Sequence, residues 1–112
     1  SVAADGTLHH KQRYGWLHVR DQDENAWADG MKCDTAGRVF VATRSGIQVL
    51  DQTGRVNAIL PLPGAAPSNL CFGGKNFDIL YVTCRDKVYR RKLHTRGVLS
   101  FLPPEKPLPP KL

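Results

Sequence analysis

Short apolar runs alternate with glycine-containing turns through the middle of the chain. Extended segments are predicted at residues 30–34, 38–43, 47–50 and 55–60, with turns at 34–37, 44–46 and 51–54. Segment 38–43 is rich in the β-branched and aromatic residues that favour strands. No segment keeps the period that an amphipathic helix needs. Strands at this spacing, joined by glycine turns, are typical of all-β sandwiches, barrels and propellers.

The second half of the chain repeats the pattern of the first half. Met31 and Cys33 align with Leu70 and Phe72, and residues 40–43 align with residues 81–84. A repeat of about 40 residues that holds four strands is typical of a propeller blade, and chance similarity between two hairpins is the alternative. We therefore predict an all-β, partial β-propeller with about two four-stranded antiparallel blades and part of a third.

Four segments are expected along the chain. Residues 1–28 are predicted to be outer strands of a preceding blade, with one strand at 12–19. Residues 29–66 and 67–101 are predicted to be two blades, and residues 102–112 a proline-rich tail. Repeated prolines exclude a central strand or a helix, so we expect a strap extended over the surface rather than a ligand for an SH3-type domain. Fewer than three repeats rarely fold alone, so the expected partners are further blades upstream or copies of the chain that close the ring.

The chain has 112 residues and a formal net charge of +6. Its cations are densest in a cluster that also contains Tyr89: Lys87, Arg90, Arg91, Lys92 and Arg96. A nucleic-acid interface would combine such cations with exposed aromatic rings. We favour a solvated strand whose lysines and arginines protect a sheet edge, and we predict no nucleic-acid partner. No apolar run approaches the roughly 20 residues of a membrane helix, so we predict no membrane partner. The compartment stays open between cytoplasmic and periplasmic or secreted.

The three cysteines, Cys33, Cys71 and Cys84, lie in apolar, strand-like runs. An odd number without a close pair argues against a disulfide framework or a zinc cluster. The histidines are not spaced as metal ligands either. We expect all three cysteines to be small buried side chains.

A set of motifs between residues 28 and 97 carries a family resemblance. The motifs are Ala28-Asp29-Gly30-Met31, Asp34-Thr35-Ala36-Gly37-Arg38, Gly46-Ile47-Gln48-Val49, Phe72-Gly73-Gly74 and Leu80-Tyr81-Val82-Thr83. Together they resemble the SMP-30/gluconolactonase family. The resemblance implies a six-bladed propeller that holds a divalent cation, usually calcium, at the mouth of its channel and hydrolyses sugar lactones. It covers only the last third of the family pattern, so we expect a C-terminal piece that is inactive alone.

Asp29 is the residue to which the site roles of the family carry over. The resemblance implies that Asp29 is a metal ligand and a catalytic general base. The remaining ligands of the family have no counterpart in this sequence. Asp-Gly is also a common turn step, and spacing alone would favour that interpretation. Ser68 and Asn69 hold the matching place in the next blade, where a role at the start of a strand is expected.

Two other functions are kept as alternatives. A fold does not dictate an activity, so the chain could belong to a non-catalytic propeller module that binds a protein or carbohydrate partner. Nucleic-acid binding by the basic strand is the least favoured. Trp16 and Trp27 are expected to be packing residues, although Trp27 lies two residues before Asp29 and could form a wall of the site.

Overall fold

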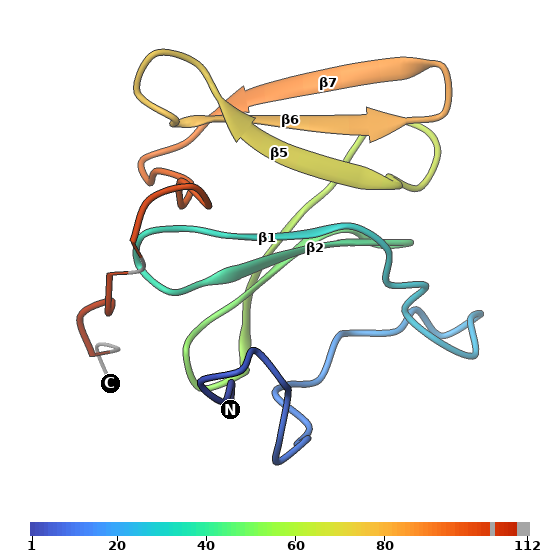
Figure 1. Cartoon of the computed structure of the whole chain (residues 1–112). Helices are drawn as coiled ribbons and strands as arrows, with labels where there is room; N and C mark the ends of the chain where they lie inside the picture. Colours follow the sequence, from blue (N-terminus) through green and yellow to red (C-terminus); the bar gives the residue numbers. More distant parts are fainter. Residues whose placement is uncertain (104, 110–112) are drawn as a thin grey trace.

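The computed structural model describes residues 1–103 and 105–109. Within them the chain forms seven strands and no helix, so the all-β prediction is confirmed. The strands are β1 (Met31–Cys33), β2 (Val39–Thr43), β3 (Gly46–Leu50), β4 (Val56–Leu60), β5 (Asn69–Gly73), β6 (Ile79–Cys84) and β7 (Lys87–Lys92). They make a four-stranded antiparallel sheet, β1-β2-β3-β4, and a three-stranded one, β5-β6-β7 (Figure 1). No helix in this described part has the length and apolar character needed to cross a membrane.

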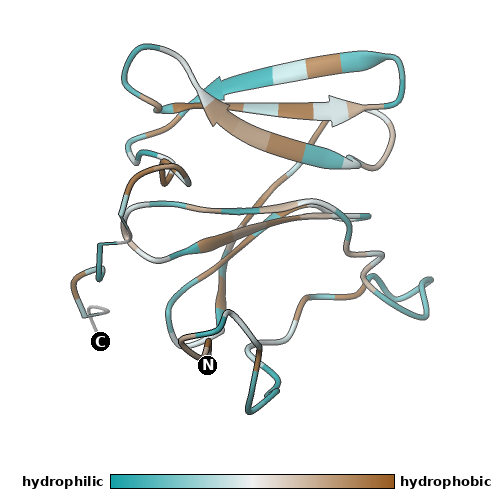
Figure 2. Cartoon of the chain, viewed as in Figure 1, coloured by the Kyte–Doolittle hydropathy of each residue, from teal (hydrophilic) through white to brown (hydrophobic). Residues whose placement is uncertain are grey.

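The hydrophobic core lies between the two sheets. It follows from the alternation of side chains along each strand, because residues two apart share a face. The first sheet contributes Phe40 and Ala42 from β2 with Ile47 and Val49 from β3, and the second contributes Leu70, Phe72, Leu80 and Val82. The rings of Phe40 and Phe72 meet edge to face, with centroids 5.2 Å apart. Figure 2 shows apolar residues alternating with polar ones along the second sheet.

Two hairpins of the first sheet are closed by the same kind of turn. The carboxylate of Asp34 accepts hydrogen bonds from the backbone N–H groups of Ala36 and Arg38 and from Arg38 Nε at 2.7 Å. Asp51 accepts the corresponding bonds from the N–H and Nε of Arg55, both at 3.0 Å. The glycine before each arginine has a positive φ, of 73° and 83°, which favours glycine. Both aspartates therefore have the turn role that the sequence predicts for them.

Residues 1–28 form no strand, and the prediction of one at residues 12–19 is wrong. Val2 and Leu8 make an isolated bridge, and the rest of this segment pairs with no strand. The segment lies on the side of the first sheet that faces away from the second sheet (Figure 1). It is held there by side chains, such as Tyr14, whose hydroxyl donates to the carbonyl of Asp51 at 2.8 Å. A segment that packs on the face of a sheet has no strand beside it in the plane of the sheet, so it cannot form the backbone hydrogen bonds of a β-strand.

The second sheet has three strands in the described residues, where four were predicted. After β7 the chain leaves the sheet edge and crosses to the turn ends of both sheets. Thr95 Oγ1 donates to Asp34 Oδ2 at 2.9 Å, and the N–H of Val98 donates to the carbonyl of Cys33 at 3.1 Å. The N–H of Gly97 donates to the carbonyl of Phe77 at 2.9 Å. Residues 95–98 therefore tie the two sheets together instead of adding a fourth strand.

The C-terminal segment lies across the turns of the first sheet. Gln52 Nε2 donates to the carbonyl of Leu108 at 2.6 Å and to that of Ala36 at 2.9 Å. Pro107 packs so closely on Gly37 that a β-carbon there would come within 2.7 Å of the proline ring. These contacts agree with a surface strap for residues 105–109. The predicted tail also includes residues 104 and 110–112, which lie outside the described residues.

The cysteine prediction is wrong for two of the three residues. Cys84 is buried, whereas Cys33 and Cys71 are exposed. Cys71 alternates with Leu70 and Phe72 along β5, so its side chain faces away from the core that those two residues fill. The apolar runs were correctly placed in strands, but their outer faces are uncovered.

Candidate functional site

Asp29 lies immediately before β1, at the end of the first sheet opposite the Asp34 turn. Its N–H donates to the carbonyl of Ala42 in β2 at 3.0 Å, so its backbone extends the pairing of β1 with β2. The residue is exposed, and its carboxylate makes no hydrogen bond or ion pair within residues 1–103 and 105–109. The carboxylate is therefore free to bind a ligand or to accept a proton.

Gly30 joins this point to the second sheet. Its N–H donates to the carbonyl of Ser68 at 3.0 Å, and its own carbonyl accepts from the N–H of Ala42 at 2.9 Å. A β-carbon on Gly30 would collide with the Asn69 side chain and would lie 2.9 Å from the Asn69 Cα. Only glycine lets the entrances of β1 and β5 approach so closely. The Asp-Gly step is thus a contact between the two sheets.

Ser68 and Asn69 lie beside this contact, as the repeat predicts. The Ser68 hydroxyl is 3.0 Å from the hydroxyl of Thr83. The Asn69 Oδ1 accepts the N–H of Leu70 at 2.8 Å, and the N–H of Asn69 donates to Thr83 Oγ1 at 3.1 Å. These bonds stabilise the start of β5, so both residues have the strand-start role that was expected.

In the loop region before Asp29, an aromatic and a cationic side chain contact each other. Trp27 is 58% exposed, and the guanidinium carbon of Arg44 lies 5.6 Å from the centroid of its ring. Arg44 follows β2 and also pairs with Asp23 at 3.5 Å. A hydrogen bond from Arg20 is the main cause that lowers the pKa of Asp23 below its ordinary value. The contact of Arg44 with Trp27 was not predicted, because no local sequence pattern links residue 44 to residue 27.

The described residues do not fit a calcium ion on their own. Calcium takes six to eight oxygen ligands, usually several of them carboxylates. Among these residues, no group of three or more histidine, cysteine, aspartate or glutamate side chains is placed to hold a metal. Asp29 contributes one carboxylate, and the nearby Asn69 oxygen already accepts a backbone N–H. A cation at Asp29 would need most of its ligands from outside this set.

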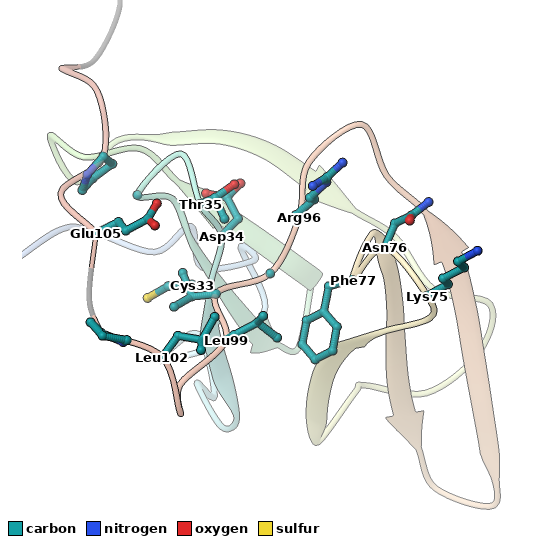
Figure 3. Close-up of a pocket in the computed structure, with 15 residues that line it drawn as sticks. Cys33, Asp34, Thr35, Lys75, Asn76, Phe77, Arg96, Leu99, Leu102 and Glu105 are labelled. Atoms are coloured by element: carbon teal, nitrogen blue, oxygen red, sulfur yellow. The ribbon is translucent and has the colours of Figure 1, made fainter.

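A cavity of about 570 Å³ lies at the other end of β1, near Cys33 and far along the strand from Asp29. Figure 3 shows Phe77, Leu99 and Leu102 along it, with the Cys33 thiol close to the C-terminal segment. Burial raises the pKa of the Cys33 thiol, and the nearby charge of Asp34 raises it further. A thiol that resists ionisation is a poor nucleophile.

Two consecutive antiparallel sheets packed face to face, each starting near a common rim, define a partial β-propeller. The chain belongs to the SMP-30/gluconolactonase/LRE-like family, whose sequence pattern matches residues 2–86.

Curated relatives and a solved structure agree with this assignment. The chain is 39% identical to regucalcin of Sus scrofa over 75 residues, which are 64% of this chain and 24% of that protein. It is 41% identical to regucalcin of Danio rerio over 70 residues, 60% of this chain and 23% of that one. An X-ray structure described as a candidate gluconolactonase superposes with a TM-score of 0.63 at 28% identity, over 69% of this chain and 26% of that chain. The chain thus spans about a quarter of the length of the proteins it matches.

Proposed function

We propose that this chain is the C-terminal part of a calcium-dependent sugar-lactone hydrolase of the gluconolactonase type, and that Asp29 is its catalytic and metal-binding carboxylate. The family assignment supports the reaction class. The observation that carries the role of Asp29 is its position: an exposed carboxylate with no partner among the residues that the structure describes, at the rim where β1 and β5 meet.

The two sheets themselves support a requirement for further blades. In the repeat, Ile47 of the first sheet corresponds to Val88 of the second, and Leu70 of the second sheet corresponds to Met31 of the first. Ile47 is 1% exposed because the second sheet covers it, whereas Val88 is 66% exposed. Leu70 is 3% exposed, whereas Met31 is 56% exposed. The outer face of the second sheet and the β1 edge of the first therefore expose positions that a neighbouring blade buries at the equivalent place, whereas residues 12–20 already cover Gln48 on the outer face of the first sheet.

Such neighbours would be blades of a longer chain or copies of this one. Burial of a side chain such as Val88 or Met31 is worth about 1.5–3 kcal/mol when it is complete. The same proposal includes the division of the chain into four parts. Residues 29–66 and 67–101 are two blades, residues 102–112 are a proline-rich tail, and residues 1–28 lie on the outer face of the first blade.

Asp29 would act on water. In the proposed site its carboxylate accepts a proton from the water that attacks the lactone carbonyl, a role that general bases fill with gains of about 10²–10⁴-fold. A bound divalent cation would polarise that carbonyl. Since this chain contributes one carboxylate, it should neither hold calcium tightly nor hydrolyse a lactone alone.

A chimera tests the proposal. In it, this chain replaces the matching quarter of Danio rerio regucalcin, and hydrolysis of glucono-δ-lactone is followed with calcium and with a chelator. Asp29→Asn should lower kcat by about 10²-fold or more. Asp86→Asn, an exposed turn substitution between β6 and β7, should leave kcat unchanged. Circular dichroism and gel filtration establish that each variant folds. Full activity of a folded Asp29→Asn chimera would exclude Asp29 from the chemistry.

A non-catalytic binding module is the second candidate, favoured by the fact that the described residues hold no group of three or more histidine, cysteine, aspartate or glutamate side chains placed to bind a metal. The two functions differ in their response to chelation. A folded chimera that neither hydrolyses the lactone nor loses partner binding without calcium would support the binding module.

A further inference from the structure

Trp27 holds an unusual backbone conformation beside Asp29. Its φ is 52°, in the left-handed region that bulky residues seldom occupy. Asn25 fixes this geometry, because its Oδ1 accepts the N–H of Trp27 at 2.8 Å. Strain of this kind costs of order 1–3 kcal/mol and clusters at ligand sites. Trp27 is 58% exposed and lies two residues before Asp29.

Arg44 fixes the ring from a different part of the chain. The N–H of Arg44 donates to the carbonyl of Ala26 at 3.0 Å, which ties the turn after β2 to the loop that carries Trp27. The guanidinium lies over the indole ring, and Asp23 holds it at 3.5 Å. One face of the ring is thereby occupied by a cation, a stabilising arrangement. Trp27 keeps 58% of its surface exposed despite this contact.

We propose that the open face of Trp27 is a stacking platform for the ring of a carbohydrate substrate, and that Arg44 is the positioning residue that holds the platform in place. The inference rests on the proposed function for the identity of that ring, a sugar lactone. An aromatic face offers a large, rigid apolar surface that suits the C–H face of a sugar ring. The guanidinium has five N–H donors, and those not used by Asp23 can reach hydroxyl groups.

Trp16 is the matched control within the same chain. It is 69% exposed, and Arg13 lies 4.8 Å from the centroid of its ring. Trp16 has no positive φ, and its arginine comes from the same local segment. Exposure and a stacked arginine are therefore common to both tryptophans, whereas the strained backbone and the position next to Asp29 belong to Trp27.

Fluorescence of single-tryptophan variants tests the platform on the chain itself. The chain has two tryptophans, so Trp16→Phe leaves Trp27 as the sole reporter and Trp27→Phe leaves Trp16. The probe is δ-gluconolactam, a cyclic analogue that resists hydrolysis, with the open-chain polyol sorbitol as control. Without added metal, we expect a saturable change in Trp16→Phe with the lactam and none with sorbitol. Adding Arg44→Gln should weaken binding about 2–5-fold through loss of the cation–π contact.

The outcomes separate this inference from the proposed function. No saturable change in Trp16→Phe, or an equal change in Trp27→Phe, overturns the platform. In the chimera, Trp27→Leu should raise KM for the lactone more than it lowers kcat, and an unchanged KM also overturns it. If the lactam binds but Asp29→Asn leaves the hydrolysis rate unchanged, the platform is supported and the role of Asp29 in a lactonase is contradicted. If Asp29→Asn abolishes hydrolysis but Trp27→Leu leaves KM unchanged, the role of Asp29 is supported and the platform is contradicted.

Discussion

The side-chain amide of Gln48 binds both backbone groups of His18. The N–H of His18 donates to Gln48 Oε1 at 2.8 Å, and Gln48 Nε2 donates to the carbonyl of His18 at 2.8 Å. Gln48 is fully buried in β3, and its Nε2 also lies 3.1 Å from Thr43 Oγ1. A single side chain thus takes the place of a neighbouring strand and fastens residues 12–20 to the outer face of the first sheet.

Replacing Gln48 with methionine should destabilise the chain by about 1–3 kcal/mol. Methionine keeps the length of the side chain but removes both hydrogen bonds to His18 and the one to Thr43, each of which contributes about 0.5–1.5 kcal/mol. Urea unfolding followed by circular dichroism measures the difference. Gln22→Met, at an exposed loop position, is the control and should change stability by less than about 0.5 kcal/mol. Hydrogen exchange should also show faster exchange of the His18 amide in Gln48→Met, and equal exchange rates would contradict the fastening role.

Much of the fold follows from local sequence signals. Asp34 and Asp51 each precede a glycine and an arginine at fixed spacing, and that combination builds the turn from bonds within five residues. Residues 80, 82 and 84 place one face of β6 in the interior, and the continuous apolar run at 39–42 fits a strand that is covered on both faces. The prediction failed at residues 12–19, because what holds this segment is Gln48, thirty residues away and hidden in an apolar strand.

The candidate site was predictable in part. The sequence predicts an extended segment that begins at residue 30, and in the structure β1 begins at Met31, with the Asp29 N–H bonded to Ala42 and the Gly30 N–H bonded to Ser68. The neighbouring Arg44 was not predicted, because only the folded loop brings its side chain over Trp27. The exposure of Cys33 and Cys71 was missed for a related reason. Whether the outer face of a strand is covered depends on neighbours that a single strand does not encode.

Acid should weaken the first sheet through Asp51. The hydroxyl of Thr53, the backbone N–H groups of Arg55 and Thr53, and the Arg55 side chain all bond to the ionised carboxylate, and they lower its pKa well below the ordinary 3.8. A carboxyl whose pKa is lower in the folded state contributes stability that is complete above its unfolded pKa. That contribution is lost as the pH falls toward the folded pKa.

The test compares Asp51→Asn with the wild-type chain in urea unfolding between about pH 7 and pH 2. At neutral pH the variant should be less stable, since an amide carries no charge for Arg55 to pair with. The difference in free energy of unfolding between the variant and the wild type should become smaller as the pH falls below about 5. For Asp86→Asn, at an exposed turn, the free energy of unfolding should depend on pH in the same way as for the wild type. A gap of constant size down to pH 2 would show that the charge of Asp51 does not stabilise the fold.

Gly30 should be the least replaceable residue at the rim, for a steric reason. Its φ is not in the left-handed region, so alanine meets no backbone strain there, but its β-carbon would collide with the side chain and backbone of Asn69. Overpacking of this kind costs about 1–3 kcal/mol.

Gly64→Asn is the control, because nothing lies within 4 Å of a β-carbon at Gly64 and asparagine tolerates its φ of 89°. Thermal unfolding should show a lower midpoint for Gly30→Ala than for Gly64→Asn. Fluorescence of Trp27 in the Trp16→Phe background should change with Gly30→Ala alone, since the rim must shift to admit the methyl group. Equal midpoints and an unchanged spectrum would mean that the entrances of β1 and β5 are not in contact, and the rim on which Asp29 stands would lose its structural basis.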